Sequence, residues 1–459
     1  MILRLALRSL ATRPVRTAVL ACGFGFGIAV MAALLGVGDV ILEQSHSPAL
    51  EGGGDVVIGG RFGVLENARF QIASVLGAPD LAAQTVATSP SKKATLYLMK
   101  DGTATAVAVT GGLPDAERAV GDRSGDTAAH WASTAADRAW SSPDTGAVLR
   151  AMDRFHPIPD TPEFAGSWAE WLYFNGRTAD GRVRFYLTFL VGPATSPGQR
   201  AAGVRLQLDR DGKTTTYAAG ASVSDAAVLA QAPDLTIGES RVRLEGSRYH
   251  ITLSLPGASG TLILDPARGQ SLPPATITGA RGWITGYTAP VLAGTVDGGF
   301  TIGRDEVVLR GATGYHDHNW GFWKGVSWQW GQVAHDGLSF IYGRIFPPSD
   351  VADPDRVPGF LGVLGAKGAL GFSTNVSLDE ANDEHGVPRQ ITIRARGTSI
   401  DVTLAFAVDR TVRTAMPITG GGSGMPMDFL QLGGPFHVEG RVGDRTIDFT
   451  ARGAAETFR

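Results

Sequence analysis

The chain has 459 residues, more than a single hydrophobic core usually holds, so two or three globular units are expected. Its 61 glycines and 25 prolines, with only 19% charged residues, are typical of short strands joined by many turns. The formal net charge of -3 gives no basic field for binding nucleic acid, and the single cysteine, Cys22, excludes an intrachain disulfide framework and a cysteine-based metal site.

The first predicted element is a transmembrane helix. Residues 17–38 contain no charged side chain, and a helix of that length spans about 33 Å, enough to cross the hydrocarbon core of a bilayer. Arginines precede this run, whereas Asp39 and Glu43 follow it. The bias of basic residues towards the cytoplasm therefore predicts a single-pass protein of the cell (inner) membrane, with a cytoplasmic N-terminus and the bulk of the chain outside. A cleaved signal peptide is the alternative.

The N-terminus also carries a resemblance to a known family. LALRSLATRPVRTAVLACGFGFGIAVMAALLGVGDVI, followed by GGGDVVIGG, resembles the start of FtsX/MacB-type ABC transporter permeases over residues 1–60. The resemblance implies a basic lead and membrane helix over residues 1–50, and a partnership with ABC transporter subunits. No later apolar run is long enough to be a further membrane helix.

A small extracytoplasmic module and a linker are predicted for residues 51–154. KKATLYLMKDGTATAVAV indicates two strands around Asp101-Gly102. Residues 111–165 are rich in Ala, Asp, Ser, Gly and Pro and end in HPIPDTPEF, which is typical of a connecting segment with a stiff proline-rich end.

Strand patterns dominate the rest of the chain. VRFYLTFLV at 183–191 and RYHITLSL at 248–255 are clear cases, and in the second Tyr249, Ile251, Leu253 and Leu255 point to one face. Similar segments recur as far as RTIDFTARG at 445–453, without a long helical period. The sequence therefore predicts a mainly β fold of two antiparallel barrels, at residues 155–345 and 346–459.

The densest group of polar and aromatic residues is GYHDHNWG at 314–321. As an extended strand it places His316 and His318 on one face and Asp317 on the other. The next segment, SWQWGQVAHDGLSFIYGRIF, predicts a hairpin that turns at Asp336-Gly337. The expected cross-strand pairs are Trp328 with Ile345, Gln329 with Arg344, Trp330 with Gly343, and Gly331 with Tyr342.

A second group is SWAEWLYFNG at 167–176. If this segment is extended, Trp171, Tyr173 and Asn175 share one face, and Glu170 lies on the other between apolar neighbours. Burial is expected to raise the pKa of Glu170, as suits an acid.

These two groups carry a second resemblance. EWLYFNG and GYHDHNWG, followed by a Trp-x-Trp strand and a tyrosine-bearing strand, resemble the hydroxyneurosporene synthase (carotenoid 1,2-hydratase) and AttH-like family over residues 155–459. The resemblance implies two lipocalin-like barrels in tandem, a cavity near their junction, and apolar substrates such as isoprenoids, carotenoids or polyketides. The hydratases are expected to have an acidic residue two positions after the tyrosine that matches Tyr342, where this chain has Arg344.

Hydration of an isolated C=C bond requires a positioned acid, aromatic faces for the carbocation, and a base that guides water. As catalytic residues of such a hydro-lyase we predict Asp317, His318 and Tyr342. The predicted ligand-binding residues are Glu170, Trp171, Tyr173, Asn175, His316, Asn319, Trp320, Trp328, Trp330 and Arg344.

Other interpretations of the same residues remain open. The HDHNW stretch also fits a structural corner, and the tryptophans of the hairpin fit simple core packing. His316 and His318 would need a third metal ligand, for which His250, His335 and His437 are candidates, so no metal or cofactor is predicted. The alternative function is a non-catalytic lipid-binding accessory of an ABC transporter.

Overall fold

The structure is a computed structural model that describes residues 83–100, 103–122, 144–365, 368–397, 399–416 and 427–458, with shorter stretches at 15, 56–58, 72, 125–126, 132–136 and 138. The chain forms two compact units, Met1–Leu65 with Val86–Ser141, and Glu66–Thr85 with Ser142–Arg459. The predicted transmembrane helix at 17–38 lies outside the described residues. Among the residues that are described, no helix is long and apolar enough to cross a membrane.

The first unit contains the predicted hairpin. Strand β1 (Ser91–Lys100) pairs antiparallel with β2 (Thr103–Gly112), and Lys100 lies opposite Thr103. This register agrees with the predicted pair of strands, and positions 101–102, where the turn was predicted, lie outside the described residues. The short helix α6 (Pro114–Ala119) follows, with a proline in its first turn, where the missing N–H costs no hydrogen bond.

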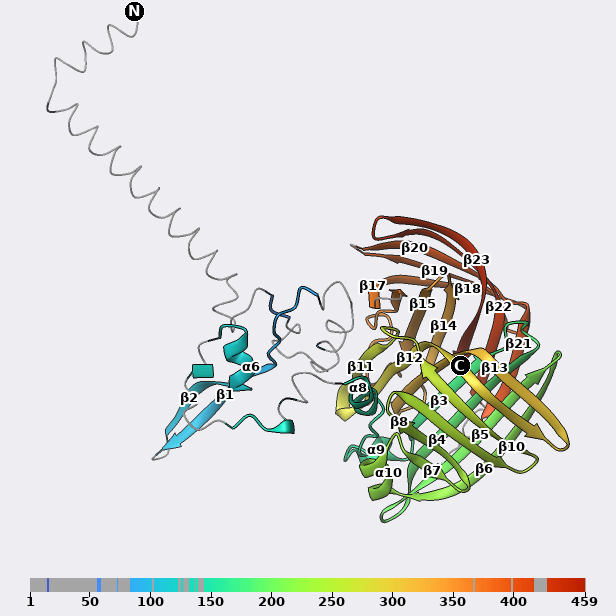
Figure 1. The fold of residues 1–459 in the computed structure, drawn as a ribbon, viewed down its shortest axis with the longest axis horizontal. Helices are drawn as coiled ribbons and strands as arrows, with labels where there is room; N and C mark the ends of the chain where they lie inside the picture. Colours follow the sequence, from blue (N-terminus) through green and yellow to red (C-terminus); the bar gives the residue numbers. More distant parts are fainter. Residues whose placement is uncertain are drawn as a thin grey trace, which may run out of the picture. The chain divides into compact units, whose positions relative to one another are not determined.

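Within the described residues, the second unit contains an 11-stranded and a 10-stranded antiparallel sheet, each curved into a nearly closed barrel (Figure 1). The first sheet consists of β3 (Trp168–Arg177), β4 (Val183–Ser196), β5 (Gln199–Arg210), β6 (Lys213–Ser224), β7 (Leu235–Ile237), β8 (Ser240–Glu245), β9 (Arg248–Leu255), β10 (Ala258–Pro266), β11 (Leu272–Thr278), β12 (Ile284–Ile302) and β13 (Asp305–Phe322). Its spatial order is β6-β5-β4-β3-β13-β12-β10-β9-β8-β7, with β11 beside β12, and contacts between β6 and β7 bring the two ends together.

The second sheet, in orange to red, completes the tandem arrangement (Figure 1). It consists of β14 (Ser327–His335), β15 (Leu338–Phe346), β16 (Phe360–Gly365), β17 (Gly368–Ser373), β18 (Asn375–Asn382), β19 (Pro388–Arg396), β20 (Ile400–Ala407), β21 (Arg410–Met416), β22 (Met427–Val442) and β23 (Arg445–Phe458). Its order is β17-β16-β15-β14-β23-β22-β20-β19-β18, with β21 beside β22. Two barrels in tandem confirm the predicted mainly β class.

The chain passes from the first sheet to the second between Phe322 and Ser327. The boundary expected from the sequence was residue 345, which lies within β15. Strands β14 and β15 belong to the second barrel because β14 pairs with β23 and β15 pairs with β16. No local pattern in the hairpin reveals which sheet it joins.

The hairpin itself has the predicted geometry. Trp328 lies opposite Ile345, Gln329 opposite Arg344, Trp330 opposite Gly343, and Gly331 opposite Tyr342. Its turn residues, Asp336 and Gly337, have φ angles of 47° and 72°. Two successive positive φ angles match the right-handed twist of the strands in a two-residue turn, and Asp-Gly tolerates them well.

The interior of each barrel is filled by alternate side chains along its strands. In β9 the predicted inward residues Tyr249, Ile251, Leu253 and Leu255 are all buried and belong to the core of the first barrel. Another core, around residues such as Phe406 and Phe436, fills the second barrel. A third apolar cluster contains residues from both sheets, so it joins the outer faces of the two barrels.

Part of the predicted linker is in fact packed against the first barrel. Helix α8 (Thr145–Met152) begins at Asp144, whose side chain accepts a hydrogen bond from the Ala147 N–H, and its residues Val148, Leu149 and Met152 are buried. Phe155 then enters the core of the first barrel. The proline-rich composition hid this short amphipathic stretch. Within residues 144–458, the other helical segments that the structure describes are α9 (Pro162–Ala165), α10 (Asp225–Gln231) and η2 (Ala280–Gly282).

Candidate functional site

Two neighbouring strands, β3 and β13, carry most of the predicted site residues. They pair so that Tyr173 lies opposite Asp317 and Leu172 opposite His318. Because successive side chains of a strand point to opposite faces, this pair of strands presents one polar group inside the first barrel and another towards the second barrel.

The polar group inside the first barrel is called here the histidine cluster and consists of Asp153, His156, Glu170, His316 and His318. Asp153 Oδ2 accepts hydrogen bonds from Tyr249 Oη at 2.5 Å and His316 Nε2 at 3.0 Å, and Asp153 Oδ1 lies 3.4 Å from His318 Nδ1. Asp153, His316 and His318 are fully shielded from solvent. The segment after α8 is therefore fastened to β13 by buried ionic contacts.

Glu170 connects His156 and His318. Its Oε1 accepts from His156 Nδ1 at 2.7 Å and from His318 Nε2 at 3.0 Å, and the His156 backbone N–H donates to both carboxylate oxygens. Burial acts to raise the pKa of Glu170, but the hydrogen bonds and charges of His156 and His318 outweigh it, so the pKa is lowered. The expectation of a raised pKa at Glu170 was wrong because the sequence did not show these partners.

The same contacts shift the two central ionisable groups in opposite directions. Burial opposes ionisation of Asp153, yet the nearby His316 and His318 hold its pKa well below the usual range. Burial also opposes protonation of His318, but its close contacts with the carboxylates of Asp153 and Glu170 raise the pKa of His318 to about 9. At neutral pH the interior thus holds a cation between two carboxylates.

Aromatic rings fix the orientation of the histidines. His316 stacks on Phe174, with ring centroids 4.1 Å apart, and His156 stacks on Trp320 at 4.4 Å. Trp320 lies across from Gly286 in the β12–β13 pairing. A Cβ atom at Gly286 would come within 2.1 Å of the Trp320 indole, so the ring occupies the space that the glycine leaves.

We expect Gly286→Ala to lower the free energy of unfolding by about 1–3 kcal/mol, because overpacking forces the Trp320 indole away from His156. Urea denaturation measures this loss. Gly362→Ala is the matched control in the other barrel, since its Cβ would meet Ile341 at an ordinary 3.5 Å. Equal stability of the two variants would show that the indole has room to move.

The second polar group is called here the junction cluster and consists of Tyr173, Tyr287, Tyr315, Asp317, Trp330 and Glu456. It lies where the outer faces of the barrels meet, because Trp330 and Glu456 come from the second sheet. Tyr173 Oη donates to Glu456 Oε1 at 2.7 Å, and Trp330 Nε1 donates to Tyr287 Oη at 3.1 Å. Both hydrogen bonds cross from one barrel to the other.

Asp317 is the end of a chain of donors within this cluster. Tyr315 Oη donates to Asp317 Oδ2 at 2.8 Å, and Asn319 Nδ2 donates to Oδ1 at 2.7 Å. Since the Tyr315 proton points at Asp317, Tyr287 Oη, 2.8 Å from Tyr315 Oη, donates to it in turn. The side chains of Trp330, Tyr287, Tyr315 and Asp317 are therefore joined by one continuous chain of hydrogen bonds.

Both carboxyl groups of the junction cluster hold protons more tightly than usual. Burial and the charge of Glu456 together raise the pKa of Asp317 well above its ordinary value, despite the hydrogen bonds from Tyr315 and Asn319. Burial raises the pKa of Glu456 to about 7, although hydrogen bonds from Tyr173 and Gln431 act to lower it. A carboxyl group whose pKa is well above its ordinary value thus lies near one that ionises close to neutral pH.

The predicted site residues divide between these two clusters. Glu170, His316, His318 and Trp320 lie in or against the histidine cluster, whereas Trp171, Tyr173, Asn175, Asp317, Asn319 and Trp330 lie on the junction side of the same strands or opposite it. Trp171 contacts Trp323 and Trp328, with centroids 4.8 Å and 6.3 Å apart, and Trp328 stacks on Phe458 at 4.1 Å.

The three predicted catalytic residues do not meet. Asp317 and His318 occupy opposite faces of β13, and Tyr342 lies in the core of the second barrel. The Tyr342 hydroxyl has no hydrogen-bond partner among the described residues. Arg344 is half-buried, donates to the Pro354 carbonyl at 3.2 Å and lies over the Phe346 ring, apart from both clusters. The alternation of the pleat separates these side chains.

Several residues of the two clusters were not among the predicted ones. Asp153 and His156 lie in the segment interpreted as a linker, and Glu456 ends a strand near the C-terminus without any distinguishing motif. Tyr315 stands inside the GYHDHNWG stretch, where its alternation with Asp317 was a usable signal. Tyr287 had no such signal.

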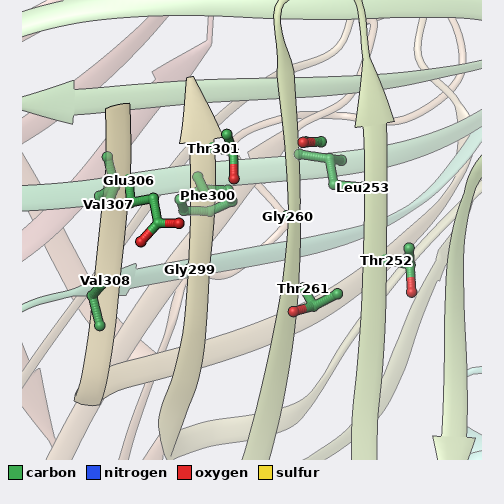
Figure 2. A pocket seen from close by; sticks show the side chains of 11 residues that line it. Thr252, Leu253, Gly260, Thr261, Gly299, Phe300, Thr301, Glu306, Val307 and Val308 are labelled. Atoms are coloured by element: carbon green, nitrogen blue, oxygen red, sulfur yellow. The ribbon is translucent and has the colours of Figure 1, made fainter. Parts of the chain in front are cut away.

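A shallow hollow of about 480 Å³ opens elsewhere on the first barrel (Figure 2). It is lined by Thr252, Leu253, Ser259, Gly260, Thr261, Gly299, Phe300, Thr301, Glu306, Val307 and Val308, from β9, β10, β12 and β13. None of the predicted site residues lines it. Its one ionisable side chain, Glu306, is exposed, so the hollow offers no evident chemistry.

One group of side chains in the described part of the chain has the composition of a metal site. His156, Glu170 and His318 each offer one ligand atom, and these atoms lie within 4.8 Å of one another. The group shares His318 with the predicted His-x-His pair. His250, the expected third ligand that belongs to the first barrel, instead lies 3.7 Å from Glu245 and is partly exposed.

The sequence matches no model of a known protein family and no curated protein. Solved structures similar to this chain include an AttH-like protein from Nitrosomonas europaea, at 15% identity and a TM-score of 0.44, over 66% of this chain and 99% of that one. Kievitone hydratase from Nectria haematococca matches at 12% identity and a TM-score of 0.43, and CghA at 12% and 0.47, each over 66% of this chain and 93% of the other.

These similarities concern the arrangement of strands alone. They give no support to the resemblance of residues 1–60 to FtsX/MacB-type permeases. In class, the described chain is a mainly β protein of two nearly closed barrels in tandem. Its chemistry is argued from its own side chains.

Proposed function

We propose that the junction cluster binds an apolar small molecule, such as an isoprenoid or carotenoid, and adds water to one of its C=C bonds. The observation that carries this proposal is the raised pKa of Asp317, set among aromatic rings and close to Glu456. A carboxyl group that keeps its proton in an apolar site is the acid that alkene protonation requires.

In the proposed reaction, separate residues act as the acid, the base and the groups that stabilise the carbocation. Asp317 donates its proton to one alkene carbon, and the other carbon becomes a carbocation that the faces of Tyr315, Trp330 and Trp171 stabilise. Water attacks this carbon, and the Glu456 carboxylate takes the proton that the water loses. The substrate thereby gains one water molecule, and proton transfer from Glu456 to Asp317 through solvent restores the starting state.

The burial of the side chains in and around the junction cluster is consistent with this role. Asp317 and Tyr315 are buried, whereas Trp171, Tyr287, Trp328 and Phe360 at the edge of the inter-barrel apolar cluster are only partly buried. An apolar ligand that approaches the acid from this edge would therefore contact aromatic side chains first. The predominance of such side chains with a few convergent polar groups is common to small-molecule sites.

The direct test incubates the purified full chain with farnesol, squalene and lycopene in detergent micelles, in water enriched with heavy oxygen. Mass spectrometry is expected to show one labelled oxygen added to at least one of these probes. Recovery of every probe unchanged, with lipid bound to the protein, would instead favour the carrier function.

The pH dependence of the reaction follows from Glu456. Because the base must be ionised, the rate is expected to rise with pH through about 7, the raised pKa of that carboxyl. Tyr173→Phe removes a hydrogen bond that stabilises the ionised form, so the rising limb should move to higher pH. Glu456→Gln should abolish the limb. A limb that stays in place in Tyr173→Phe would mean that another group titrates.

The alternative of a non-catalytic lipid-binding accessory expects a site without ionisable groups. The two carboxyl groups of the junction cluster favour catalysis over simple carriage. Location at the cell membrane, with a cytoplasmic N-terminus and possible contact with ABC transporter subunits, remains a prediction from residues 1–60.

A further inference from the structure

We propose that His156, Glu170 and His318 form a binding site for a divalent transition-metal cation, for which zinc is the best match. This site is separate from the junction cluster, because Glu170 and His318 point into the first barrel whereas Tyr173 and Asp317 point away from it. The inference therefore stands independently of the proposed hydration.

The donor atoms are of the right kind and are close to the right distances. Two imidazoles and one carboxylate, with a fourth position open, form a ligand set that catalytic zinc sites use. His156 Nδ1 and His318 Nε2 lie 2.7 Å and 3.0 Å from Glu170 Oε1. A zinc ion about 2.1 Å from each atom needs them about 3.4 Å apart, so each nitrogen has to move away from Oε1 by less than about 1 Å. All three atoms lie within 4.8 Å of one another.

The three ligands come from separate segments that are held in place from outside. Glu170 lies on β3 and His318 on β13, which are paired strands, and His156 lies on the segment after α8. Arg200, which is 1% exposed, donates to the His156 carbonyl at 3.2 Å, and Trp320 stacks on the His156 ring. The ligands thus retain their orientation when an ion enters.

The assignment is also supported by the Asp153 carboxylate, which lies beside the second ring nitrogen of His318. Asp153 Oδ1 lies 3.4 Å from His318 Nδ1, the ring nitrogen that faces away from Glu170, and neither atom has a hydrogen-bond partner among the described residues. Metal-binding histidines usually donate their second N–H to such a carboxylate, which fixes the tautomer that leaves the other nitrogen free to coordinate. Asp153 is in position to do this for His318.

An ion also has a route to the site. The side chains of Glu170 and His318 are fully buried, but that of His156 is 30% exposed. The open coordination position would therefore lie on the side of His156, where water or a small ligand reaches it. A metal held there would also link the segment after α8 to the sheet.

The test adds zinc or cobalt to the metal-free full chain. Native mass spectrometry should show one bound zinc ion, cobalt should give the visible absorption of a four- or five-coordinate ion, and zinc should raise the melting temperature. His156→Ala and Glu170→Gln should each lose the bound ion, and Asp153→Asn should weaken binding by about 10–100-fold.

His250→Ala is the matched control, because it removes a half-exposed histidine of the same barrel and should leave metal binding unchanged. Circular dichroism identifies any variant that does not fold, and His156→Gln then replaces His156→Ala. The proposal is overturned if the folded wild type binds no stoichiometric ion, or if binding persists in the His156 and Glu170 variants. In either case the histidine cluster is a metal-free ionic clamp.

Discussion

Asp317→Asn is expected to lower kcat/KM for the hydrated probe by about 10²–10⁴-fold, the usual contribution of a general acid, while the ligand still binds. The amide has the shape of the carboxyl group but no acidic proton to give to an alkene. It still accepts the hydrogen bond from Tyr315, and Asn319 can rotate its own amide to pair with it. Loss of rate with retained binding is therefore the signature of the acid.

The matched control for this variant is Asp305→Asn. Asp305 lies on the same strand, β13, but it is exposed and paired with Arg210 at 3.0 Å. Rates measured with the labelled-oxygen assay should be unchanged in the control. If Asp317→Asn also retained full activity, Asp317 would not be the proton donor, whatever the ligand.

The second large effect concerns stability. Asp153→Ala should lower the free energy of unfolding by about 3–5 kcal/mol, the range for removing one partner of a buried ion pair. His316, His318 and the Tyr249 hydroxyl would all lose the acceptor that they share in an interior closed to solvent. Urea denaturation followed by tryptophan fluorescence measures the loss, and Asp305→Ala, which breaks an exposed pair, should cost less than about 1 kcal/mol.

The stability lost in Asp153→Ala is expected to decrease as the pH rises. His318 has a folded-state pKa of about 9, above its ordinary 6.5, so its contribution is fully present below pH 6.5 and disappears as the pH rises through about 9. The cost of Asp153→Ala should therefore be greatest just below pH 6.5 and smaller above about pH 9. A cost that is constant over this range would mean that the charge of His318 does not contribute.

Local features of the fold follow directly from the sequence. The β14–β15 register was predictable because Asp-Gly specifies a two-residue turn, which fixes every cross-strand pair from Trp328 onwards. The opposite orientations of His316 and Asp317 were likewise predictable, because the side chains of a strand alternate. These features depend on residues that are close together in the chain.

The composition of the site depends on contacts between distant segments. Glu456 reaches Tyr173 only because β14 pairs with β23 and the two barrels pack face to face. Likewise, Asp153 meets His316 through the packing of α8, which no local pattern connects to β13. The pKa of Glu170 was predicted with the wrong sign for the same reason, since its two histidine partners lie at other positions in the chain.

The central claim is that Asp317 keeps its proton at a pH where an exposed aspartate has lost it, and difference infrared spectroscopy tests this most directly. At about pH 6, where an ordinary aspartate is ionised, the wild-type protein should show the C=O stretch of a protonated carboxylic acid that is missing from Asp317→Asn. Identical spectra of the two proteins in that region would show that Asp317 is ionised and would contradict its role as the acid.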